Sequence, residues 1–382
     1  MDIDTRHEIQ NTRYENMRAL ITCGGTGGHI FPAIALAQEL KRKDNSQVIF
    51  VIGDKLSTKE LIKKAGFRYF TISVPKMPYG FSLDWLGFVP RLIRSRIQAD
   101  EIVAKINPDI AIGFGAYLSG PVISAAISMK IKTVIHEQNA SLGRANRLLL
   151  HKVDRACFSF DDKVIKKNNK YRLTGNPIRK ELLDGFKMIT KEEALTRLGF
   201  SDQKKTVLVL GGSGGSSFIN KLFIDFAKSL SDKERLKIQF LHITGHNDFE
   251  FVSENYRFSD VEHLVRDSFD KMALLYKAAD IIVCRAGATT IAELTLFGLP
   301  AIFIPYPWAG GHQRENASVI ARNGAAILLE EKDITISRFK KELTSTLNDS
   351  ENINTMRVNM QKLSNIDATA RLTDEIEELL NA

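Results

Sequence analysis

Short apolar runs recur along the chain, and each is followed by a glycine-containing turn and then by a longer amphipathic stretch. Residues 281–284, Ile-Ile-Val-Cys, form such a run, which is typical of a strand buried on both faces of a parallel sheet. The next apolar stretch, residues 291–297, predicts a helix that ends before Gly298 and Pro300. Residues 301–304 then predict the next buried strand. This alternation predicts an α/β fold with parallel sheets.

The arrangement of strand, glycine loop and helix occurs twice. The first set covers residues 19–23, 24–28 and 32–40, and the second covers residues 206–210, 211–215 and 216–230. The repetition predicts two Rossmann-like, doubly wound domains that face each other across a cleft.

The first glycine loop, residues 24–28, is neither a dinucleotide fingerprint nor a Walker loop, because its glycine spacing and the residues after it fit neither pattern. Backbone N–H groups of such a loop can still hold a phosphate. His29 follows at the predicted helix start, where the helix dipole disfavours imidazolium. A neutral ring there can accept a proton, so His29 is a candidate general base. The alternative is a histidine that only hydrogen-bonds the loop.

The start of the helix that follows residues 281–284 is a second candidate phosphate site, because a helix N-terminus at the carboxyl end of a parallel strand favours an anion. Thr289 and Thr290 are candidate caps for this helix. Glu293, in its first turns, predicts a carboxylate that accepts two hydrogen bonds from the diol of a ribose. The alternative is that Glu293 only complements the helix dipole.

Other polar segments are expected at the same crevices. Gln313 and Asn316 begin the helix after residues 301–304 and can reach back towards the second phosphate site. In the first half, residues 113–117 form a second glycine loop, and residues 136–139 follow another predicted strand. His136 and Glu137 in that last segment are interpreted as structural.

Residues 79–89 hold four aromatic side chains, two glycines and a single charge, and they show no clean period. This stretch either folds under as core or stays exposed as a membrane anchor formed by Phe81, Trp85 and Phe88. A helix is predicted for residues 90–106, with an apolar stripe that packs in the first domain and a basic ridge outside. The stripe is Leu92, Ile93, Ile97, Ala99, Val103 and Ile106, and the ridge is Arg91, Arg94 and Lys105.

Composition narrows the function classes. A chain of 382 residues favours two domains, and 44% hydrophobic with 26% charged residues is ordinary for a globular protein. The net charge of +8 suits an anionic bilayer or an acidic substrate, whereas the scattered Lys and Arg do not favour nucleic acid. The three cysteines lack metal-ligand spacing and are interpreted as reduced core residues. No apolar run reaches the length of a membrane span, and the only Asp-x-Asp motif, Asp2 to Asp4, lies in a polar tail, so no metal or other cofactor is predicted.

The segment CRAGATTIAELTLFGLPAIFIPYPWAGGHQRENA resembles the donor site of the MurG family of bacterial glycosyltransferases. GGTGGHIFPAIALAQEL, HEQNASLGRANRLL, TGNPIR and GGSGGSSFIN resemble the same family in the same order, from about Met17 nearly to the C-terminus. The resemblance implies the GT-B architecture and transfer of N-acetylglucosamine (GlcNAc) from UDP-GlcNAc to lipid I, the undecaprenyl-linked muramyl-pentapeptide. The product is lipid II, an intermediate of peptidoglycan synthesis.

The resemblance, together with the patterns above, predicts the site residues. The expected catalytic residues are His29 and Glu293. The expected donor-binding residues are Thr26, Gly27, Gly28, Asn139, Arg179, Ser213, Phe269, Ala288, Thr289, Thr290, Ile291, Ala292, Glu293, Gln313 and Asn316. The expected acceptor-binding residues are Gly24, Gly25, Gly115, Tyr117 and Asn139.

The chain departs from the family at three positions, since Ala116 replaces a usual glycine, Gly214 a usual glutamine and Ser216 a usual alanine. If position 116 needs a positive φ angle, alanine is strained there. Because position 214 is glycine, any contact that the family's glutamine side chain makes there is absent in this chain.

The predicted organisation is a disordered tail (1–16), an acceptor and membrane-associating domain (17–176), a donor domain (177–364) and a C-terminal helix (365–382) that the resemblance returns to the first domain. The resemblance also implies a peripheral protein on the cytoplasmic face of the inner membrane, with partners among cell-wall synthesis and division proteins. The alternatives are a diacylglycerol glycosyltransferase, a UDP-sugar epimerase and a catalytically silent nucleotide-sugar sensor.

Overall fold

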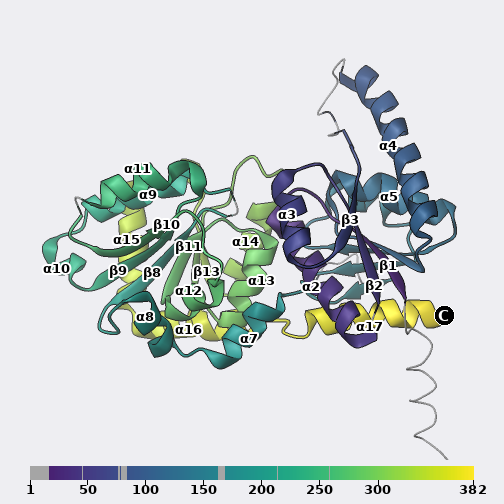
Figure 1. Cartoon of the computed structure of the whole chain (residues 1–382). Coiled ribbons are helices and arrows are strands. Elements are labelled where there is room, and N and C mark those ends of the chain that lie inside the picture. The colour runs from purple at the N-terminus through teal and green to yellow at the C-terminus, as the bar shows by residue number, and fades with distance from the viewer. Residues whose placement is uncertain are drawn as a thin grey trace, which may run out of the picture. The chain divides into compact units, whose positions relative to one another are not determined.

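The structure is a computed structural model that describes residues 17–44, 46–75, 78, 84–161, 168–212, 214–257 and 259–382. The described residues form two compact α/β units (Figure 1). Unit 1 ends at Arg179 and also includes Asp367–Ala382, whereas unit 2 is Lys180–Ile366. Each unit has a parallel sheet with helices on both faces, which confirms the predicted fold class.

Unit 1 is built on a parallel sheet whose described strands have the order β3-β2-β1-β4-β5-β6-β7. The strands are β1 (Arg18–Thr22), β2 (Gln47–Ile52), β3 (Arg68–Thr71), β4 (Ile110–Gly113), β5 (Lys132–Glu137), β6 (Arg155–Phe158) and β7 (Tyr171–Leu173). The helices are α2 (Gly27–Asp44), α3 (Leu56–Lys64), α4 (Asp84–Ile106), α5 (Ala116–Ser128), α6 (Arg144–Leu149) and α17 (Ala368–Asn381).

Both faces of this sheet are buried, which explains the continuous apolar runs. Ala19 and Ile21 of β1 face the core against α2 and α17, whereas Leu20 faces the core against α4 and α5. Because successive side chains of a strand point to opposite faces of the sheet, the apolar residues of β1 contribute alternately to the two cores.

Helix α17 completes the core of unit 1. Leu372, Ile376 and Leu379 belong to the same buried cluster as the apolar side of α2. Glu375 pairs with Arg155 of β6 and with Arg172 of β7, the latter at 3.2 Å. Apolar contacts and ion pairs together hold the end of the chain on the first unit.

Unit 2 repeats the design with the described strand order β10-β9-β8-β11-β12-β13. The strands are β8 (Lys205–Leu210), β9 (Ile238–Ile243), β10 (Glu262–Arg266), β11 (Ile281–Cys284), β12 (Ala301–Phe303) and β13 (Ala326–Leu328). The longer helices are α7 (Lys180–Met188), α8 (Lys191–Leu198), α9 (Ser217–Lys228), α11 (Phe249–Tyr256), α12 (Met272–Ala278), α13 (Ala288–Phe297), α14 (His312–Arg322), α15 (Ile336–Asn348) and α16 (Ser350–Lys362). The short ones are α10 (Asp232–Arg235), η2 (His246–Asp248) and η3 (Glu331–Asp333).

A buried cluster of unit 2 lies under α9, α11 and α15. Phe223, Phe226, Phe240 and Phe339 pack there largely edge to face, with ring centroids 5.2 to 6.0 Å apart. Such pairs add about 0.5–1.5 kcal/mol each beyond burial of their area. This rigid core supports the loops at the carboxyl ends of β8 and β9.

Helix α4 begins earlier than the sequence predicted. It starts at Asp84 and continues through Pro90, so Trp85 and Phe88 lie on the helix and not in a loop before it. Phe88 is buried and its ring meets that of Trp85 at 5.3 Å, whereas Trp85 is 38% exposed. Phe81 lies outside the described residues. Phe88 is therefore core, and its prediction as a membrane contact is wrong.

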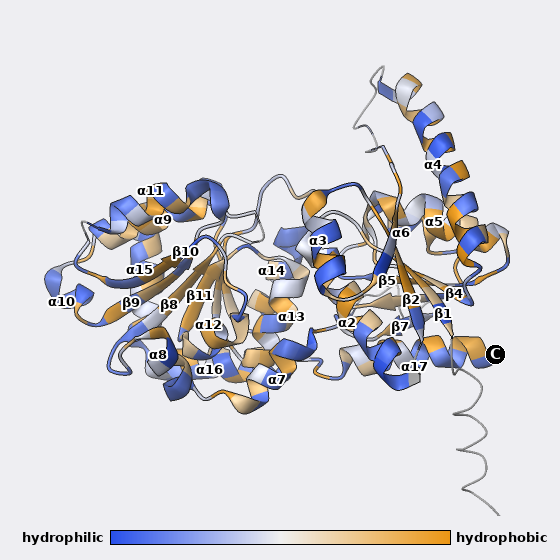
Figure 2. Cartoon of the chain, viewed as in Figure 1, coloured by the Kyte–Doolittle hydropathy of each residue, from blue (hydrophilic) through white to orange (hydrophobic). Residues whose placement is uncertain are grey.

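The apolar stripe predicted for α4 was also wrong in two places. Ile93 and Ile97 are 55% and 53% exposed, whereas Ala99, Val103 and Ile106 are buried. At 100° per residue, Ile93 and Ile97 lie about 120° and 160° from Ala99, so they share no face with it. The N-terminal turns of α4 extend beyond the sheet, and Figure 2 shows apolar positions on them.

Candidate functional site

The chemistry-bearing loops of unit 1 meet at one edge of its sheet. β1 pairs with β2 on one side and with β4 on the other, so the chain order reverses at β1. Such a switch point, at the carboxyl ends of the strands, is where α/β folds bind ligands. The segments that follow β1, β4 and β5 carry His29, Gly115 and Gln138, respectively.

The two glycine loops of unit 1 are in direct contact. A Cβ on Gly24 would lie 2.2 Å from the Cβ of Ala116, so only glycine fits at position 24. A Cβ on Gly115 would lie 3.5 Å from Cε1 of His29, which places this loop against the imidazole ring. Ala116 has φ 58°, so the predicted strain at this position is present and costs on the order of 1 kcal/mol.

The His29 ring is held from one side. His29 lies in the first turn of α2, where its N–H donates to the carbonyl of Thr26. Its Nδ1 lies 2.8 Å from Oε1 of Gln138, and the side chain is half-buried. The sequence missed Gln138, because only the fold brings the loop after β5 beside the start of α2.

His136 and Gln138 form a buried chain behind His29. Nε2 of His136 lies 2.9 Å from the Gly175 carbonyl, and its Nδ1 lies 3.0 Å from Nε2 of Gln138. Burial lowers the pKa of His136 to about 4, so the ring is neutral at neutral pH. Gly175 precedes Arg179, the last residue of unit 1 before the chain enters unit 2.

Unit 2 contains a comparable buried histidine. His242 lies between Tyr256 and Asn220, at 3.1 and 3.0 Å, and burial lowers its pKa to about 3. Asn220 donates in turn to the carbonyl of Thr244, which fixes the loop after β9.

We expect the two units to lose stability as the pH falls from 7.5 to 5. In the unfolded chain both histidines take up a proton near pH 6.5, but the folded chain keeps them neutral down to their lowered pKa values of about 4 and 3. The unfolded state therefore binds more protons in this window, at a cost of about 2 kcal/mol per histidine at pH 5. Urea unfolding at the two pH values measures the loss. An unchanged midpoint, or an unchanged pH dependence in His242→Gln, would contradict this account.

Glu137 organises the loop that carries Asn139. Its carboxylate accepts hydrogen bonds from the backbone N–H of Asn139 and Gly143 and from the side chains of Asn139 and Asn146, at 2.8 to 3.1 Å. This supports the structural interpretation of Glu137.

Tyr117, a predicted acceptor-binding residue, lies on α5, and its side chain is 39% exposed.

In unit 2 the switch point lies between β8 and β11, and α13 starts directly above it. Gly287 is the N-cap and Gly298 ends the helix with φ 60°. Thr289 and Thr290 therefore lie in the first turn, and their prediction as caps is wrong. A helix N-terminus at such an edge favours an anion, because the first N–H groups of a helix have no partner within the helix. The predicted donor-binding residues Ile291 and Ala292 follow in the same turns, with Ile291 buried.

Glu293 lies in the second turn of α13, is 6% exposed and accepts a hydrogen bond from the Tyr276 hydroxyl at 2.7 Å. A helix dipole acts mainly on groups in the first turn, so complementing the dipole does not explain this placement. Tyr276 comes from α12 and was not predicted from the sequence.

Arg285 joins three loops at this edge. It is 8% exposed and donates to the carbonyls of Ile304 and Pro305 and to Oγ of Ser216, at 2.8 to 3.2 Å, and it pairs with Glu331. Ser216, one of the three departures from the family, also caps α9. Ser216 therefore ties the glycine loop after β8 to the loop between β11 and α13.

The amides predicted in the donor site hold neighbouring loops. Asn316 is fully buried and donates to the Ala286 carbonyl at 3.1 Å. Gln313 accepts from the Tyr306 N–H at 2.9 Å. A Cβ on Gly214 would meet no atom within 4 Å, so a larger side chain fits there. Ser213 lies outside the described residues.

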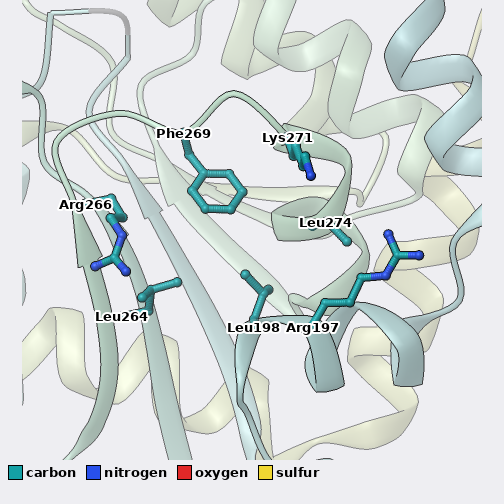
Figure 3. A pocket seen from close by; sticks show the side chains of 7 residues that line it. All are labelled: Arg197, Leu198, Leu264, Arg266, Phe269, Lys271 and Leu274. Atoms are coloured by element: carbon teal, nitrogen blue, oxygen red, sulfur yellow. The ribbon is translucent and has the colours of Figure 1, made fainter.

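Phe269 lines a pocket of about 520 Å³ between α8, β10 and α12. Figure 3 shows its ring pointing into the space between the flanking side chains. The lining residues are Arg197, Leu198, Leu264, Arg266, Phe269, Lys271 and Leu274.

The predicted site residue Arg179 belongs to unit 1, where its guanidinium stacks on the ring of Phe31 of α2, 4.1 Å from the ring centroid. Among the residues that the structure describes, no three His, Cys, Asp or Glu side chains cluster as metal ligands would.

Two family models cover most of the chain. Residues 19–158 match the glycosyltransferase family 28 N-terminal domain, and residues 206–372 match the C-terminal domain. A relative from Thermoanaerobacter sp. is 39% identical over 95% of this chain and its own full length. One from Caldanaerobacter subterraneus is 40% identical over 93% of this chain and 98% of its own. Both are named UDP-N-acetylglucosamine--N-acetylmuramyl-(pentapeptide) pyrophosphoryl-undecaprenol N-acetylglucosamine transferase.

Solved structures share the fold. MurG from Acinetobacter baumannii is 24% identical, with a TM-score of 0.74 over 95% of this chain and 99% of its own. A UDP-GlcNAc 2-epimerase from Neisseria meningitidis is 14% identical, with a TM-score of 0.68 over 95% of this chain and all of its own. Because the relatives align along nearly their whole length and both domain models match in order, the chain belongs to glycosyltransferase family 28 and, within it, to the MurG family.

Proposed function

We propose that this enzyme transfers GlcNAc from UDP-GlcNAc to the 4-hydroxyl of undecaprenyl-diphospho-N-acetylmuramyl-pentapeptide, which converts lipid I to lipid II. The observation that carries the proposal is an identity of 39–40% over at least 93% of the chain with relatives named for this reaction. The loops gathered at the switch point of each unit support it, since they provide one place for an acceptor and one for a nucleotide.

The proposed reaction is a single displacement that inverts the anomeric carbon. The acceptor oxygen forms a bond to that carbon, the bond from the carbon to the β-phosphate oxygen breaks, and the hydroxyl proton passes to Nε2 of His29. UDP departs with both electrons of the broken bond. The N–H groups at Ala288–Thr290 and the Arg179 guanidinium stabilise the charge on the diphosphate.

The remaining binding roles follow from position in the fold. Glu293 accepts hydrogen bonds from the ribose diol, and the segment that begins at Phe269 lies against the uracil. Gln313 and Asn316 support the loop beside the sugar. In unit 1, the glycine loops and Asn139 hold the acceptor.

Three assays separate this function from its alternatives. Purified protein is incubated with UDP-GlcNAc and a short-chain lipid I analogue, with diacylglycerol, or with no acceptor. We expect a disaccharide product with lipid I alone. Glycosylated diacylglycerol would identify a glycolipid synthase, and conversion of the donor without acceptor would identify an epimerase. UDP binding without turnover in any assay would leave only a sensor.

We propose further that the enzyme works as a peripheral protein on the cytoplasmic face of the membrane, with α4 as its contact. None of the helices that the structure describes combines the length and apolar character that a bilayer crossing needs. The exposed residues Leu86, Val89, Ile93 and Ile97 recur at helical spacing and form one stripe on α4. At 100° per residue, exposed Arg94 lies about 80° from Leu86, at the edge of the stripe, and exposed Arg91 lies about 140° from Leu86. A basic side chain near an anionic surface adds about 1 kcal/mol of attraction.

Vesicle co-sedimentation tests this contact. Leu86→Ser/Ile93→Ser/Ile97→Ser is expected to stay folded and to lose binding to anionic vesicles, because the three side chains are exposed and pack against no core. Arg91→Glu/Arg94→Glu is expected to lose binding as well. The wild-type protein should bind less as salt rises, since salt screens the attraction of its arginines. Met188→Ser/Leu236→Ser removes similarly exposed apolar groups from unit 2 and serves as the control. Equal binding of the control and the α4 variants would place the membrane contact elsewhere.

A further inference from the structure

We propose that Gln138 and His136 are positioning residues that fix the tautomer of His29, with hydrogen on Nδ1 and a free lone pair on Nε2. The proposal rests on the proposed function only for the use of that lone pair as the base. The tautomer itself follows from which atoms can donate and which can only accept.

The chain of bonds begins at a backbone carbonyl. The Gly175 oxygen lies 2.9 Å from Nε2 of His136 and can only accept, so this nitrogen carries the hydrogen. The His136 ring is fully buried and its lowered pKa of about 4 keeps it neutral. Its Nδ1 therefore has no hydrogen and accepts.

A second carbonyl fixes the orientation of the Gln138 amide. Nε2 of Gln138 lies 3.0 Å from Nδ1 of His136 and 3.1 Å from the His136 carbonyl oxygen. Both atoms accept, so the amide NH₂ must face them and Oε1 must face His29. That oxygen lies 2.8 Å from Nδ1 of His29 and can only accept, so His29 carries its hydrogen on Nδ1.

Burial prevents the chain from reversing. Gln138 is 1% exposed, and the Phe114 ring packs against the His136 ring with centroids 5.3 Å apart. Nδ2 of Asn146 donates to the His136 carbonyl at 3.2 Å and to Glu137, the charged group adjacent to this chain. A flipped amide would leave buried acceptors facing an oxygen, which costs about 1–3 kcal/mol for each unsatisfied group.

The consequence concerns the nitrogen that faces the substrate. Without an acceptor at Nδ1, an imidazole exchanges its hydrogen between both nitrogens, so Nε2 is basic for only part of the time. By accepting the hydrogen of Nδ1, the uncharged Gln138 oxygen keeps the lone pair on Nε2 at all times. A carboxylate in the same place would instead favour imidazolium, because a nearby negative charge stabilises the charged ring.

Nitrogen NMR of the full-length protein labelled with ¹⁵N-histidine tests the tautomer without relying on activity. At pH 8 we expect a pyrrole-type signal for Nδ1 and a pyridine-type signal for Nε2 of His29, identified by its loss in His29→Ala. The opposite pattern in the wild-type protein would overturn the proposal. In Gln138→Leu both signals should move towards exchange-averaged values, whereas Gln98→Leu, an exposed change on α4, should leave them unchanged.

Kinetics test the consequence. Gln138→Leu is expected to lower kcat by about tenfold or more with the KM for UDP-GlcNAc unchanged. Gln138→Glu should move the acid limb of the kcat/KM profile to higher pH by about one unit, which a purely structural glutamine would not do. An unshifted limb in a folded Gln138→Glu would overturn the positioning role. If the NMR signals show the expected tautomer but His29→Ala remains active, the tautomer assignment is confirmed and the proposed role of His29 as the general base is wrong.

Discussion

His29→Ala is expected to lower kcat by roughly 10²–10⁴-fold, the range that a positioned general base contributes. Nucleophilic attack by the 4-hydroxyl requires loss of its proton, and His29 is the group whose ring lies against the second glycine loop and whose Nδ1 is already bonded to Gln138. Steady-state turnover with a saturating lipid I analogue measures the loss.

UDP affinity, measured by calorimetry, should stay nearly intact in this variant, because His29 lies in unit 1 and the proposed nucleotide contacts Ala288–Thr290 and Glu293 lie in unit 2. The thermal midpoint should change little, since the ring is only half-buried. Turnover within a few-fold of wild type would show that the base lies elsewhere or that the hydroxyl loses its proton only after attack.

Glu293→Ala is expected to raise the KM for UDP-GlcNAc by roughly 10–10²-fold, which corresponds to about 1.5–3 kcal/mol for hydrogen bonds to a charged group. The carboxylate is 6% exposed and already accepts from Tyr276, so one oxygen is fixed in place before the ribose binds. Initial rates over a series of donor concentrations give the KM, and UDP binding gives the affinity directly.

Tyr276→Phe is the matched variant, because it keeps the ring and removes the hydroxyl that donates to Glu293. We expect Tyr276→Phe to raise the KM less than Glu293→Ala does. That result would fit a Tyr276 hydroxyl that positions Glu293 and a Glu293 carboxylate that binds the ribose. Unchanged UDP affinity in a folded Glu293→Ala would eliminate the ribose contact. Glu293→Gln separates charge from shape, since the amide keeps one acceptor oxygen.

The short buried strands were the most predictable part of the structure. Ile281–Cys284 is apolar at every position because both faces of the sheet are covered, and no amphipathic helix has that pattern. The turn chemistry was equally local. Thr190 caps α8 and Gly199 ends it with φ 75°, and both are residue types typical of those positions.

Helix α4 shows where local rules failed. A proline often marks the first turn of a helix, but Pro90 lies inside a helix that begins at Asp84. Ile93 and Ile97 were predicted to belong to one apolar stripe with Ala99, but their angular positions place them on the opposite side of the helix from Ala99, and both are exposed. A stricter measure of the helical period would have separated them from the buried face.

The missed site residues share one cause. Gln138, Tyr276 and Arg285 act on groups that are far from them in sequence, such as His29, Glu293 and Ser216. Each is an ordinary polar residue, and its partner is determined by the order of the elements in the fold. No spacing rule within one segment contains that information.

The return of α17 to unit 1 determines the order in which the protein can mature on the ribosome. Unit 2 is one continuous segment, Lys180–Ile366, and can fold once it has emerged. The part of unit 1 that ends at Arg179 is synthesised before unit 2, but Leu372, Ile376 and Leu379, which close the core of unit 1, are synthesised only after unit 2. During synthesis the apolar side of α2 therefore stays uncovered by α17 while unit 2 is made, and the core of unit 1 is completed only afterwards.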